Sequence, residues 1–310
     1  MFKNSRSAAG QVIDNATRSY KWVLIGNSHI ETYSVAPQMW NTLFKSKNMP
    51  IMCTVFGSDD KQEVSDYLSM AVRDVHFVGA NIARPWKVTA FLACNDIEPV
   101  AKSVYTVNTI VRYNESLNGY NTDGIGMVNS TLAYTKLRNK NVVLIGAGGA
   151  TQTLPFHLLR SGISSLVVID IYPDKAETLV AKYLNQFQEA GAIIKSISNH
   201  ELGNALSSSD IVINATPSGS LDSQEQIPFS ISLLSGLKRG CTVSEMVYNP
   251  YYTPLIDKAY KHGCTVVPGV NMLMEQAAAS FMAAFDYELS VEDKTLMLET
   301  AKQALPNLRA

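Results

Sequence analysis

The stretch Asn141-Val-Val-Leu-Ile-Gly-Ala-Gly-Gly-Ala150 decides the fold of this chain. Its apolar residues 142–145 predict a buried parallel strand, and the glycines that follow predict a tight turn. A helix is expected over residues 151–160, with its leucines on one side. A strand that passes through glycines into a helix points backbone N–H groups at an anion, such as the pyrophosphate of a dinucleotide.

An acidic residue follows at the distance that a dinucleotide-binding fold requires. The apolar strand 166–169 ends in Asp170, 24 residues after Gly146, close to the position of an acid that binds the ribose. An ordinary glycine turn and a solvated aspartate would explain either feature alone. The complete order of strand, turn, helix, strand and acid favours a dinucleotide site.

Length and composition exclude several classes of protein. The chain has 310 residues, enough for two domains with separate cores, and is 46% hydrophobic and 17% charged, as expected of a globular protein. The formal net charge is −1, so we expect no nucleic-acid partner and no membrane partner. Without a membrane-spanning run or the apolar core of a signal peptide, the cytoplasm is the expected compartment.

The cysteines are scattered along the chain, at Cys53, Cys94, Cys241 and Cys264, and form no Cys-x-x-Cys pair. This pattern predicts buried thiols in a reducing compartment, with neither a disulfide framework nor a metal site. At the start of the chain, the polar residues 1–20 predict a loose or locally docked arm.

Strand and helix signals alternate along the first 120 residues. Strands are expected at 22–26, 50–56, 75–79 and 106–111, helices at 35–44, 62–72 and 85–94, and a turn at Asn118-Gly119. This alternation predicts an α/β domain. Beyond a break at residues 120–123, six strands are expected at 142–145, 166–170, 193–197, 211–214, 241–246 and 264–267, which predicts a doubly wound parallel sheet.

After Gly269 the pattern becomes wholly helical, over residues 271–286 and 291–304. No strand signal remains beyond these helices, so we expect them to return to the first domain. The predicted fold is α/β, with an N-terminal α/β domain of residues 1–122 and 272–310. Residues 123–271 are expected to form a dinucleotide-binding domain.

Three polar residues beside apolar or glycine-containing stretches are candidates for chemistry: Lys87, Asn108 and Asp123. Asn108 lies inside the expected strand 106–111. Judged one at a time, a lysine is more often a solvated surface group, and an aspartate in Asn-Thr-Asp-Gly is more often a turn former. Spacing alone therefore favours a structural explanation for each residue.

Over residues 23–284 the chain resembles the shikimate/quinate dehydrogenase family. Its motifs occur in the order typical of that family: Tyr33-Ser-Val-Ala-Pro37, Gly79-Ala-Asn-Ile-Ala-Arg-Pro-Trp-Lys87, Val107-Asn-Thr109, Asn121-Thr-Asp123, Gly146-Ala-Gly-Gly-Ala150, Asn214-Ala-Thr-Pro-Ser-Gly219, Met246-Val-Tyr248 with Thr253-Pro-Leu255, and Gly269-Val-Asn-Met-Leu-Met-Glu-Gln276. Ordered matches of this number are far more specific than any single motif.

The resemblance implies an NAD(P)-dependent enzyme that interconverts the secondary alcohol and the ketone of a cyclic hydroxy acid, shikimate or quinate. It implies a first domain that binds substrate and a catalytic pair of Lys87 and Asp123. The acid would be bound by Ser34, Asn81, Asn108, Tyr248 and Gln276. The cofactor would contact Gly146, Ala147, Gly148, Gly149, Ala150, Asp170, Thr216, Met246, Gly269 and Met272. The protein is expected to be a monomer or a homodimer.

The implied catalytic pair suits the chemistry. Oxidising a secondary alcohol requires a hydride acceptor, which NAD provides, and a group that takes the hydroxyl proton. Lys87 beside Asp123 can take that proton. Alternatively, Lys87 stabilises the alkoxide while Asp123, directly or through water, takes the proton. The sequence leaves both assignments open.

Two positions depart from the family. Its members usually carry Ser-x-Ser before the proline and Asn-x-Thr before the lysine, whereas here the second serine is Ala36 and the threonine is Ala83. A buried carboxylate or ring hydroxyl that lacks its partner loses about 1–3 kcal/mol. The substrate is then either a weakly bound shikimate or another cyclic acid, such as an aminoshikimate. Tyr33 and Arg84 could replace the missing donors, unless Arg84 faces solvent.

A catalytically silent sensor that binds the ligand and NAD is a further alternative. The presence of Lys87, Asn108, Asp123 and Gln276 argues against it, because silent relatives tend to lose the catalytic pair.

The segment Asp170-Ile-Tyr-Pro-Asp-Lys175 predicts NAD as the cofactor in preference to NADP. Members of the family that use NADP carry an arginine here, which binds the 2′-phosphate. Asp170 would instead accept a hydrogen bond from a free 2′-hydroxyl and repel a phosphate.

Overall fold

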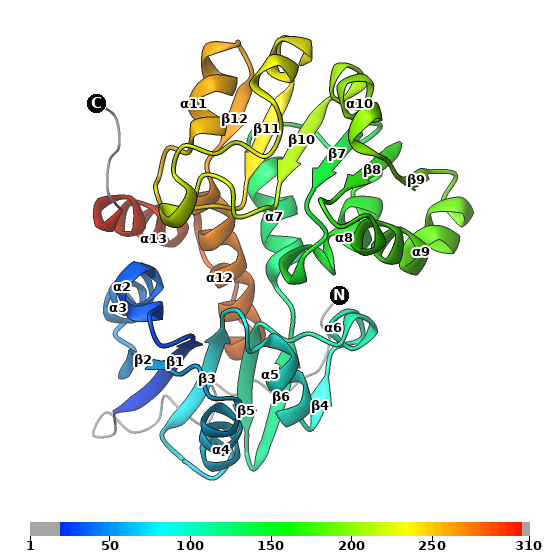
Figure 1. Cartoon of the computed structure of the whole chain (residues 1–310). Helices are drawn as coiled ribbons and strands as arrows, with labels where there is room; N and C mark the ends of the chain where they lie inside the picture. Colours follow the sequence, from blue (N-terminus) through cyan, green and yellow to red (C-terminus); the bar gives the residue numbers. More distant parts are fainter. Residues whose placement is uncertain (1–18, 306–310) are drawn as a thin grey trace. The chain divides into compact units, whose positions relative to one another are not determined.

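A computed structural model describes residues 19–305 of the chain. These residues form two compact units (Figure 1), one of residues 19–122 and 276–304 and the other of residues 123–275. The chain leaves the first unit after Thr122 and re-enters it after Glu275, whereas the second boundary was expected after residue 271. The predicted N-terminal arm falls almost wholly on residues 1–18, outside the described residues.

The first unit is built on a mixed sheet with the strand order β2-β1-β3-β5-β6-β4. Its strands are β1 (Tyr20–Gly26), β2 (Ile51–Gly57), β3 (Phe77–Ile82), β4 (Asp96–Ile97), β5 (Thr109–Tyr113) and β6 (Ser116–Tyr120). β1 pairs in parallel with β2 and β3, and β5 pairs antiparallel with β3 and β6. The carboxyl end of β3 therefore lies beside the beginning of β5.

Helices cover both faces of this sheet. They are α2 (Ile30–Tyr33), α3 (Ala36–Ser46), α4 (Lys61–Ala71), α5 (Lys87–Ala93), α6 (Pro99–Val104), the last part of α12 (Gly269–Phe285), and α13 (Val291–Ala304). Successive residues of a strand point to opposite faces, so Val23 joins the core formed with α4, whereas Trp22 lies 4.9 Å from the ring of Trp40 on α3. Phe285 of α12 completes this aromatic side.

The last part of α12 and the whole of α13 belong to the first unit, as predicted. The side chain of Lys47, directly after α3, forms an ion pair of 2.6 Å with Asp293 of α13. The same carboxylate accepts the N–H of Ser290 at 3.0 Å and so caps the start of α13. Asp293 is 8% exposed and the side chain of Lys47 is 26% exposed, so this pair is partly shielded from water.

The second unit contains a parallel sheet with the strand order β12-β11-β10-β7-β8-β9. Its strands are β7 (Asn141–Ile145), β8 (Ser165–Ile169), β9 (Ile193–Ser196), β10 (Ile211–Asn214), β11 (Thr242–Glu245) and β12 (Thr265–Val267). All of them lie where the sequence predicts strands. The order reverses between β7 and β10, which is the switch point at which doubly wound sheets bind ligands.

Five α-helices of the second unit pack around this sheet (Figure 1): α7 (Asp123–Leu132), α8 (Leu154–Arg160), α9 (Pro173–Glu189), α10 (Leu202–Ser208) and α11 (Pro254–Lys261). One apolar core joins the strands to α10 and α11 through side chains such as Val143, Leu206 and Leu255. The carboxyl ends of the strands therefore lie along one edge of the sheet, together with the glycine turn that follows β7.

Two local predictions were wrong. Asn118 and Gly119 lie within β6, and the turn before it contains Asn114, whose φ is 54°. Gly119 is needed for close packing, because a Cβ there would lie 2.7 Å from Val107 and 2.9 Å from Cys94. The expected helix 151–160 is a short turn, Gly149–Thr151, followed by α8. Pro155 explains the late start, since it has no N–H to bond the preceding turn.

Two strands are also displaced from their predicted positions. The third strand runs over Phe77–Ile82, later than the predicted 75–79, and so contains Asn81. Asn108 precedes β5 instead of lying inside a strand. Its backbone still bonds both neighbours, donating to Tyr120 at 3.0 Å and accepting from Ile82 at 2.7 Å. The side chain of Asn108 therefore lies where the pairing of the strands ends. There it is able to form hydrogen bonds with other loops.

The cysteines follow the sequence prediction with one exception. Cys53, Cys241 and Cys264 are buried, whereas Cys94 is half-buried, and all four are free thiols. Burial raises the pKa of Cys53, Cys94 and Cys241 to about 12, so these thiols stay protonated near neutral pH. Among residues 19–305, no helix has the length and hydropathy needed to cross a bilayer.

Asp293→Ala should lower the free energy of unfolding of the first unit by about 1–3 kcal/mol. The substitution removes the carboxylate from Lys47 and the acceptor from the N–H of Ser290. Tryptophan fluorescence during denaturant unfolding measures this loss specifically, because the three tryptophans, Trp22, Trp40 and Trp86, all lie in the first unit.

Glu299→Ala is the matched control for this variant. It removes an exposed ion pair of 2.8 Å with Lys302 on the same helix, and should change the unfolding free energy by less than about 0.5 kcal/mol. Equal losses in the two variants would contradict a special contribution from the Lys47–Asp293 pair.

Candidate functional site

A buried network of polar side chains is centred on Asn108, of which 3% is exposed. Its Oδ1 accepts the backbone N–H of Thr122 at 2.8 Å and the hydroxyl of Thr109 at 3.0 Å. Its Nδ2 donates to Oγ1 of Thr122 at 3.0 Å. These bonds use both the donor and the acceptor of one amide, so they fix its rotamer and hold the segment after β6 beside the start of β5.

The network continues from β5 to β3 and α12. Asn81 accepts a hydrogen bond of 2.8 Å from Nε1 of Trp22 and donates one of 3.1 Å to the hydroxyl of Ser280. The hydroxyls of Ser280 and Thr109 lie 2.7 Å apart. Two strands and a helix far apart in the sequence are therefore held in one arrangement.

Gln276 joins this network from the same side of α12 as Ser280, one turn earlier. Its backbone carbonyl accepts from the hydroxyl of Ser280 at 2.9 Å, and its Oε1 lies 3.4 Å from the hydroxyl of Thr122. Three of the predicted substrate-binding residues, Asn81, Asn108 and Gln276, are thus brought together in the first unit. Thr109, Thr122 and Ser280 were not predicted. The spacing of Ser280 four residues after Gln276 on a helix was the available signal.

The segment that precedes Asp123 is held by a second side chain. A carboxylate oxygen of Glu98 accepts the backbone N–H of Asn121 at 2.6 Å. Burial raises the pKa of Glu98 to about 7, against the lowering effect of this bond. Because Glu98 binds residue 121 and Asn108 binds residue 122, the backbone is fixed immediately before Asp123.

The two predicted catalytic residues belong to different units. Lys87 is the first residue of α5 in the first unit, and 9% of it is exposed. Its neighbour Trp86 anchors the start of this helix by donating to the carbonyls of Gly26 at 3.0 Å and Ser58 at 2.9 Å. Asp123 is the first residue of α7 in the second unit and is 5% exposed. Both side chains are buried, unlike ordinary surface charges.

The positions that depart from the family lie near the start of α3 and the end of β3. Ser34 is buried, and its hydroxyl accepts the N–H of Ala36 at 3.3 Å. Ala36 is also buried, whereas Ala83 is half-buried. Arg84 is exposed, so the structure favours the solvent-facing alternative for that side chain. Tyr33 is half-buried and donates to Oδ1 of Asn27 at 3.3 Å.

The glycine turn after β7 has the conformation that the sequence predicts. Gly146 has a φ of 101°, which L residues rarely adopt. A Cβ on Gly148 or Gly149 would meet no atom within 4 Å, so the surface of the turn is open. Asp170 follows β8 and accepts the N–H of Ala147 at 2.7 Å and that of Tyr172 at 2.9 Å. Asp170 therefore lies beside the turn. Its hydrogen bond to Ala147 also stabilises the turn, a contact that the sequence did not indicate.

The predicted residues Met246, Tyr248, Gly269 and Met272 lie around the ends of β11 and β12. A Cβ on Gly269 would lie 2.2 Å from the carbonyl oxygen of Val247. Only glycine permits the backbone at residue 269 to lie so close to Val247. This close packing places the start of α12 against residues 246–248. Met272, one turn along α12, is buried, whereas Met246 and Tyr248 are half-buried.

A fully buried acid, Glu245, lies at the end of β11 and was missed by the sequence analysis. It is 1% exposed. Burial raises its pKa to about 8, and hydrogen bonds from Asn214, Thr253 and the backbone of residues 246 and 247 oppose that rise. The available signal was its position, since an acid that directly follows the apolar part of a parallel strand lies at the edge where ligands bind.

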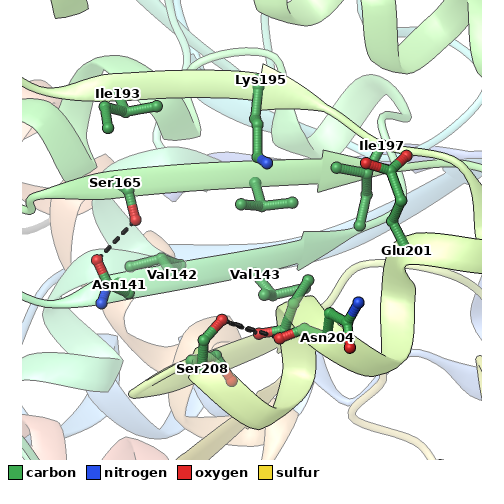
Figure 2. A pocket seen from close by; sticks show the side chains of 13 residues that line it. Asn141, Val142, Val143, Ser165, Ile193, Lys195, Ile197, Glu201, Asn204 and Ser208 are labelled. Carbon is green, nitrogen blue, oxygen red and sulfur yellow. Dashed lines mark hydrogen bonds between the residues drawn. The ribbon is translucent and has the colours of Figure 1, made fainter.

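Figure 2 shows a separate pocket of about 420 Å³ in the second unit. It lies over the face of β7, β8 and β9, with Val143 and Val167 in its lining and Lys195 and Glu201 among its polar residues. On β7 it is lined by residues 141–143, at the opposite end of the strand from the glycine turn. We assign this pocket no part in the candidate site.

Comparison with known families agrees with this division of the chain. The family described as the shikimate dehydrogenase substrate binding domain matches residues 24–110. The family described as shikimate/quinate 5-dehydrogenase matches residues 129–225. Two relatives named shikimate dehydrogenase (NADP(+)), from Methanosphaera stadtmanae and Bacillus cereus, are 32% and 31% identical to this chain. The matches cover 82% and 80% of this chain and 87% of each relative.

Solved structures share the fold. A shikimate dehydrogenase in complex with NADP+ is 26% identical, with a TM-score of 0.82, over 94% of this chain and 98% of that one. A quinate dehydrogenase from Corynebacterium glutamicum in complex with NAD is 24% identical, with a TM-score of 0.77, over 91% and 98%. A 5-ketofructose reductase of Gluconobacter is 22% identical, with a TM-score of 0.78, over 93% and 99%. The last two show a common fold.

Glu245→Gln should remove part of the pH dependence of stability. The pKa of Glu245 rises from 4.5 to about 8 on folding, so the folded state binds a proton that the unfolded state releases in this interval. The contribution of Glu245 to stability therefore falls as the pH rises from about 4.5 to about 8. The free energy of unfolding, measured with denaturant across this pH range, should fall more steeply with pH for the unsubstituted protein than for the variant. Parallel curves would contradict the raised pKa.

Proposed function

This chain belongs to the shikimate/quinate dehydrogenase family, and from that membership we propose that it interconverts the alcohol and ketone of shikimate or quinate with a nicotinamide dinucleotide. The observation that carries the proposal is the buried network that joins Asn81, Asn108 and Gln276. Preorganised amides at a site cost little further ordering when a polar ring binds. The hydrogen bonds offset the cost of burying these polar groups and hold them in one arrangement.

Two side chains are assigned to the proton transfer. We assign Lys87 and Asp123 to the proton of the reacting hydroxyl, with Lys87 stabilising the oxyanion and Asp123 accepting the proton. The segment that carries Asp123 is held by Glu98 and Asn108 at the two preceding residues. A site held in this way keeps the carboxylate in place without reorganisation during the reaction. The bound nicotinamide supplies the hydride acceptor.

The second unit suits a dinucleotide. The open turn at Gly148 and Gly149 leaves room for a pyrophosphate against backbone N–H groups, and Asp170 stands at the end of the next strand. Thr216, Met246, Gly269 and Met272 are assigned to the same cofactor, and Ser34 and Tyr248 to the acid. These assignments rest on their motifs and on their location at the carboxyl ends of the strands.

The substrate can differ from shikimate at one end of the ring. Ala36 and Ala83 present methyl groups where relatives present hydroxyls, and Arg84 is exposed. A different cyclic acid, such as an aminoshikimate, is therefore the second candidate for the same chemistry. Comparison of kcat/KM for shikimate, quinate and aminoshikimate separates the candidates, because a lost hydrogen bond of about 1.4 kcal/mol changes affinity tenfold.

NAD is proposed as the preferred form of the cofactor, although the relatives are named for NADP(+). Asp170 places a negative charge at the end of β8, and the next residue is Ile171, which is 79% exposed, instead of an arginine. A carboxylate at this position accepts from a ribose 2′-hydroxyl and repels a 2′-phosphate. Lys175 is turned toward the ring of Tyr172, with its Nζ 4.5 Å from the centroid.

Lys87→Ala should lower kcat by about 100-fold or more, the scale of a general acid–base group. Asp123→Asn should lower kcat strongly as well. If the two side chains act as one unit, the double variant should be little slower than the slower single variant. Steady-state rates of NADH formation measure this, and NAD binding provides the control, since it should be nearly unchanged in Lys87→Ala. Fully additive losses would contradict a paired mechanism.

The unsubstituted protein should use NAD with a kcat/KM at least about tenfold higher than that for NADP, because a 2′-phosphate meets the charge of Asp170. Ile171→Arg should raise kcat/KM for NADP, since it adds a cation and keeps the bonds from Asp170 to the turn. Asp170→Asn with Ile171→Arg should reverse the preference. Equal use of both cofactors, or a preference for NADP, by the unsubstituted protein would contradict the assignment.

A further inference from the structure

Glu245 and Asn214 are direct neighbours in the sheet of the second unit. Asn214 is the last residue of β10, Glu245 is the last residue of β11, and the two are register partners. Asn214 is fully buried, and Glu245 is 1% exposed. β10 borders the switch point of this sheet, between β7 and β10. The pair therefore lies beneath the edge at which a doubly wound sheet binds its ligand.

Three groups donate hydrogen bonds to the carboxyl group of Glu245. Nδ2 of Asn214 lies 2.8 Å and 3.1 Å from its two oxygens. The N–H of Val247 donates at 3.0 Å, and the hydroxyl of Thr253 donates at 3.1 Å. The carboxyl oxygens accept these bonds, and a buried donor that loses its acceptor destabilises the arrangement. Glu245 therefore holds the end of β10, the loop after β11 and the start of α11 together.

The contacts continue from Asn214 to the glycine turn. Oδ1 of Asn214 accepts the N–H of Thr216 at 3.0 Å and its hydroxyl at 2.8 Å. Thr216 in turn lies against Gly146, where an added Cβ would be 3.2 Å from Cγ2 of Thr216. The orientation of the Asn214 amide is set by Glu245, because only its NH2 group is able to donate to a carboxylate. Its carbonyl is thereby left to hold Thr216.

We propose that Glu245 is a positioning residue that fixes segments 214–216 and 246–247 as the two walls of the dinucleotide site. The proposal rests on the proposed function, in which both segments contact the cofactor. Glu245 acts through Asn214 on the first wall and through the N–H of Val247 on the second. Its removal displaces both walls relative to the glycine turn, so the affinity for the dinucleotide falls, whereas the acid-binding network of the first unit is unchanged.

The first test is Glu245→Gln in the full chain. The amide has the same shape, but its NH2 group must face another donor, which breaks at least one of the bonds to Asn214, Val247 or Thr253. We expect the Kd for NADH, measured by titration calorimetry, and the KM for NAD to rise at least tenfold, with a smaller rise in the KM for the acid, since Tyr248 directly follows Val247. A lower melting temperature with unchanged Kd and KM would show a purely structural brace and overturn the proposal.

Asp210→Asn is the matched control, because it alters a carboxylate just before the opposite end of β10. Asp210 accepts the N–H of Asn141 at 3.0 Å and pairs with Lys238 at 3.5 Å. This variant should lower the melting temperature without changing the Kd for NADH. An equal rise of Kd in both variants would mean that any loosening of the sheet weakens cofactor binding, and would overturn the assignment to Glu245.

Asn214→Ala tests the route through which Glu245 acts. If Glu245 works through Asn214, the double variant should bind NADH little more weakly than the weaker single variant, whereas independent effects add. Additive losses would overturn the proposed route. If Glu245→Gln does not fold, Glu245→Asp keeps the charge but withdraws it by one methylene, and the same rise in Kd for NADH is expected. An unchanged Kd in that variant would also overturn the proposal.

Binding of NADH separates this proposal from the proposed function. If the unsubstituted protein binds NADH but oxidises none of the cyclic acids, the proposed reaction fails, and the Kd comparison among the variants still tests Glu245.

Discussion

The hydrogen bond from the backbone N–H of Thr122 to the side-chain carbonyl of Asn108 is the interaction on which the candidate site depends. It is 2.8 Å long and buried, so breaking it leaves a polar group without water or partner and costs about 1–3 kcal/mol. Through it, the start of β5 holds the last residue of the first unit before the chain passes to Asp123. Ser280 and Asn81 extend the same network to α12 and β3.

Both units bury polar side chains near the ends of their strands. Polar side chains have to be present where a polar ligand binds, yet burying them is unfavourable unless they are hydrogen-bonded. In the first unit, amides and hydroxyls bond one another around Asn108. In the second, the buried Glu245 accepts hydrogen bonds from Asn214, Thr253 and the loop after β11. In each case satisfying the buried groups also fixes residues that we assign to the candidate site.

The sequence predicted the local parts of this architecture well. The six strands of the second unit, the glycine turn and the return of the C-terminal helices were correct, because apolar periodicity and glycine punctuation are encoded in neighbouring residues. The errors came from tertiary contacts. Gly119 looked like a turn residue, but it lies in β6 because Val107 and Cys94 leave no space for a Cβ.

The residues of the candidate site show the same division between local and tertiary signals. Asn81, Asn108 and Gln276 were predicted from their motifs, and the structure brings them together. Ser280 was not predicted, since its partners Asn81 and Thr109 are far away in the sequence and no local pattern relates them. Glu245 was overlooked for a related reason, because an acid at a strand end looks solvated until the packing around it is known.

Initial rates of NADH formation, measured with the unsubstituted protein, NAD and each of shikimate and quinate, test the central claim most directly. The account predicts turnover of at least one of these acids, saturable in both the acid and the dinucleotide. Binding of NAD without turnover of either acid or of an aminoshikimate, under conditions in which the protein is folded, would contradict it.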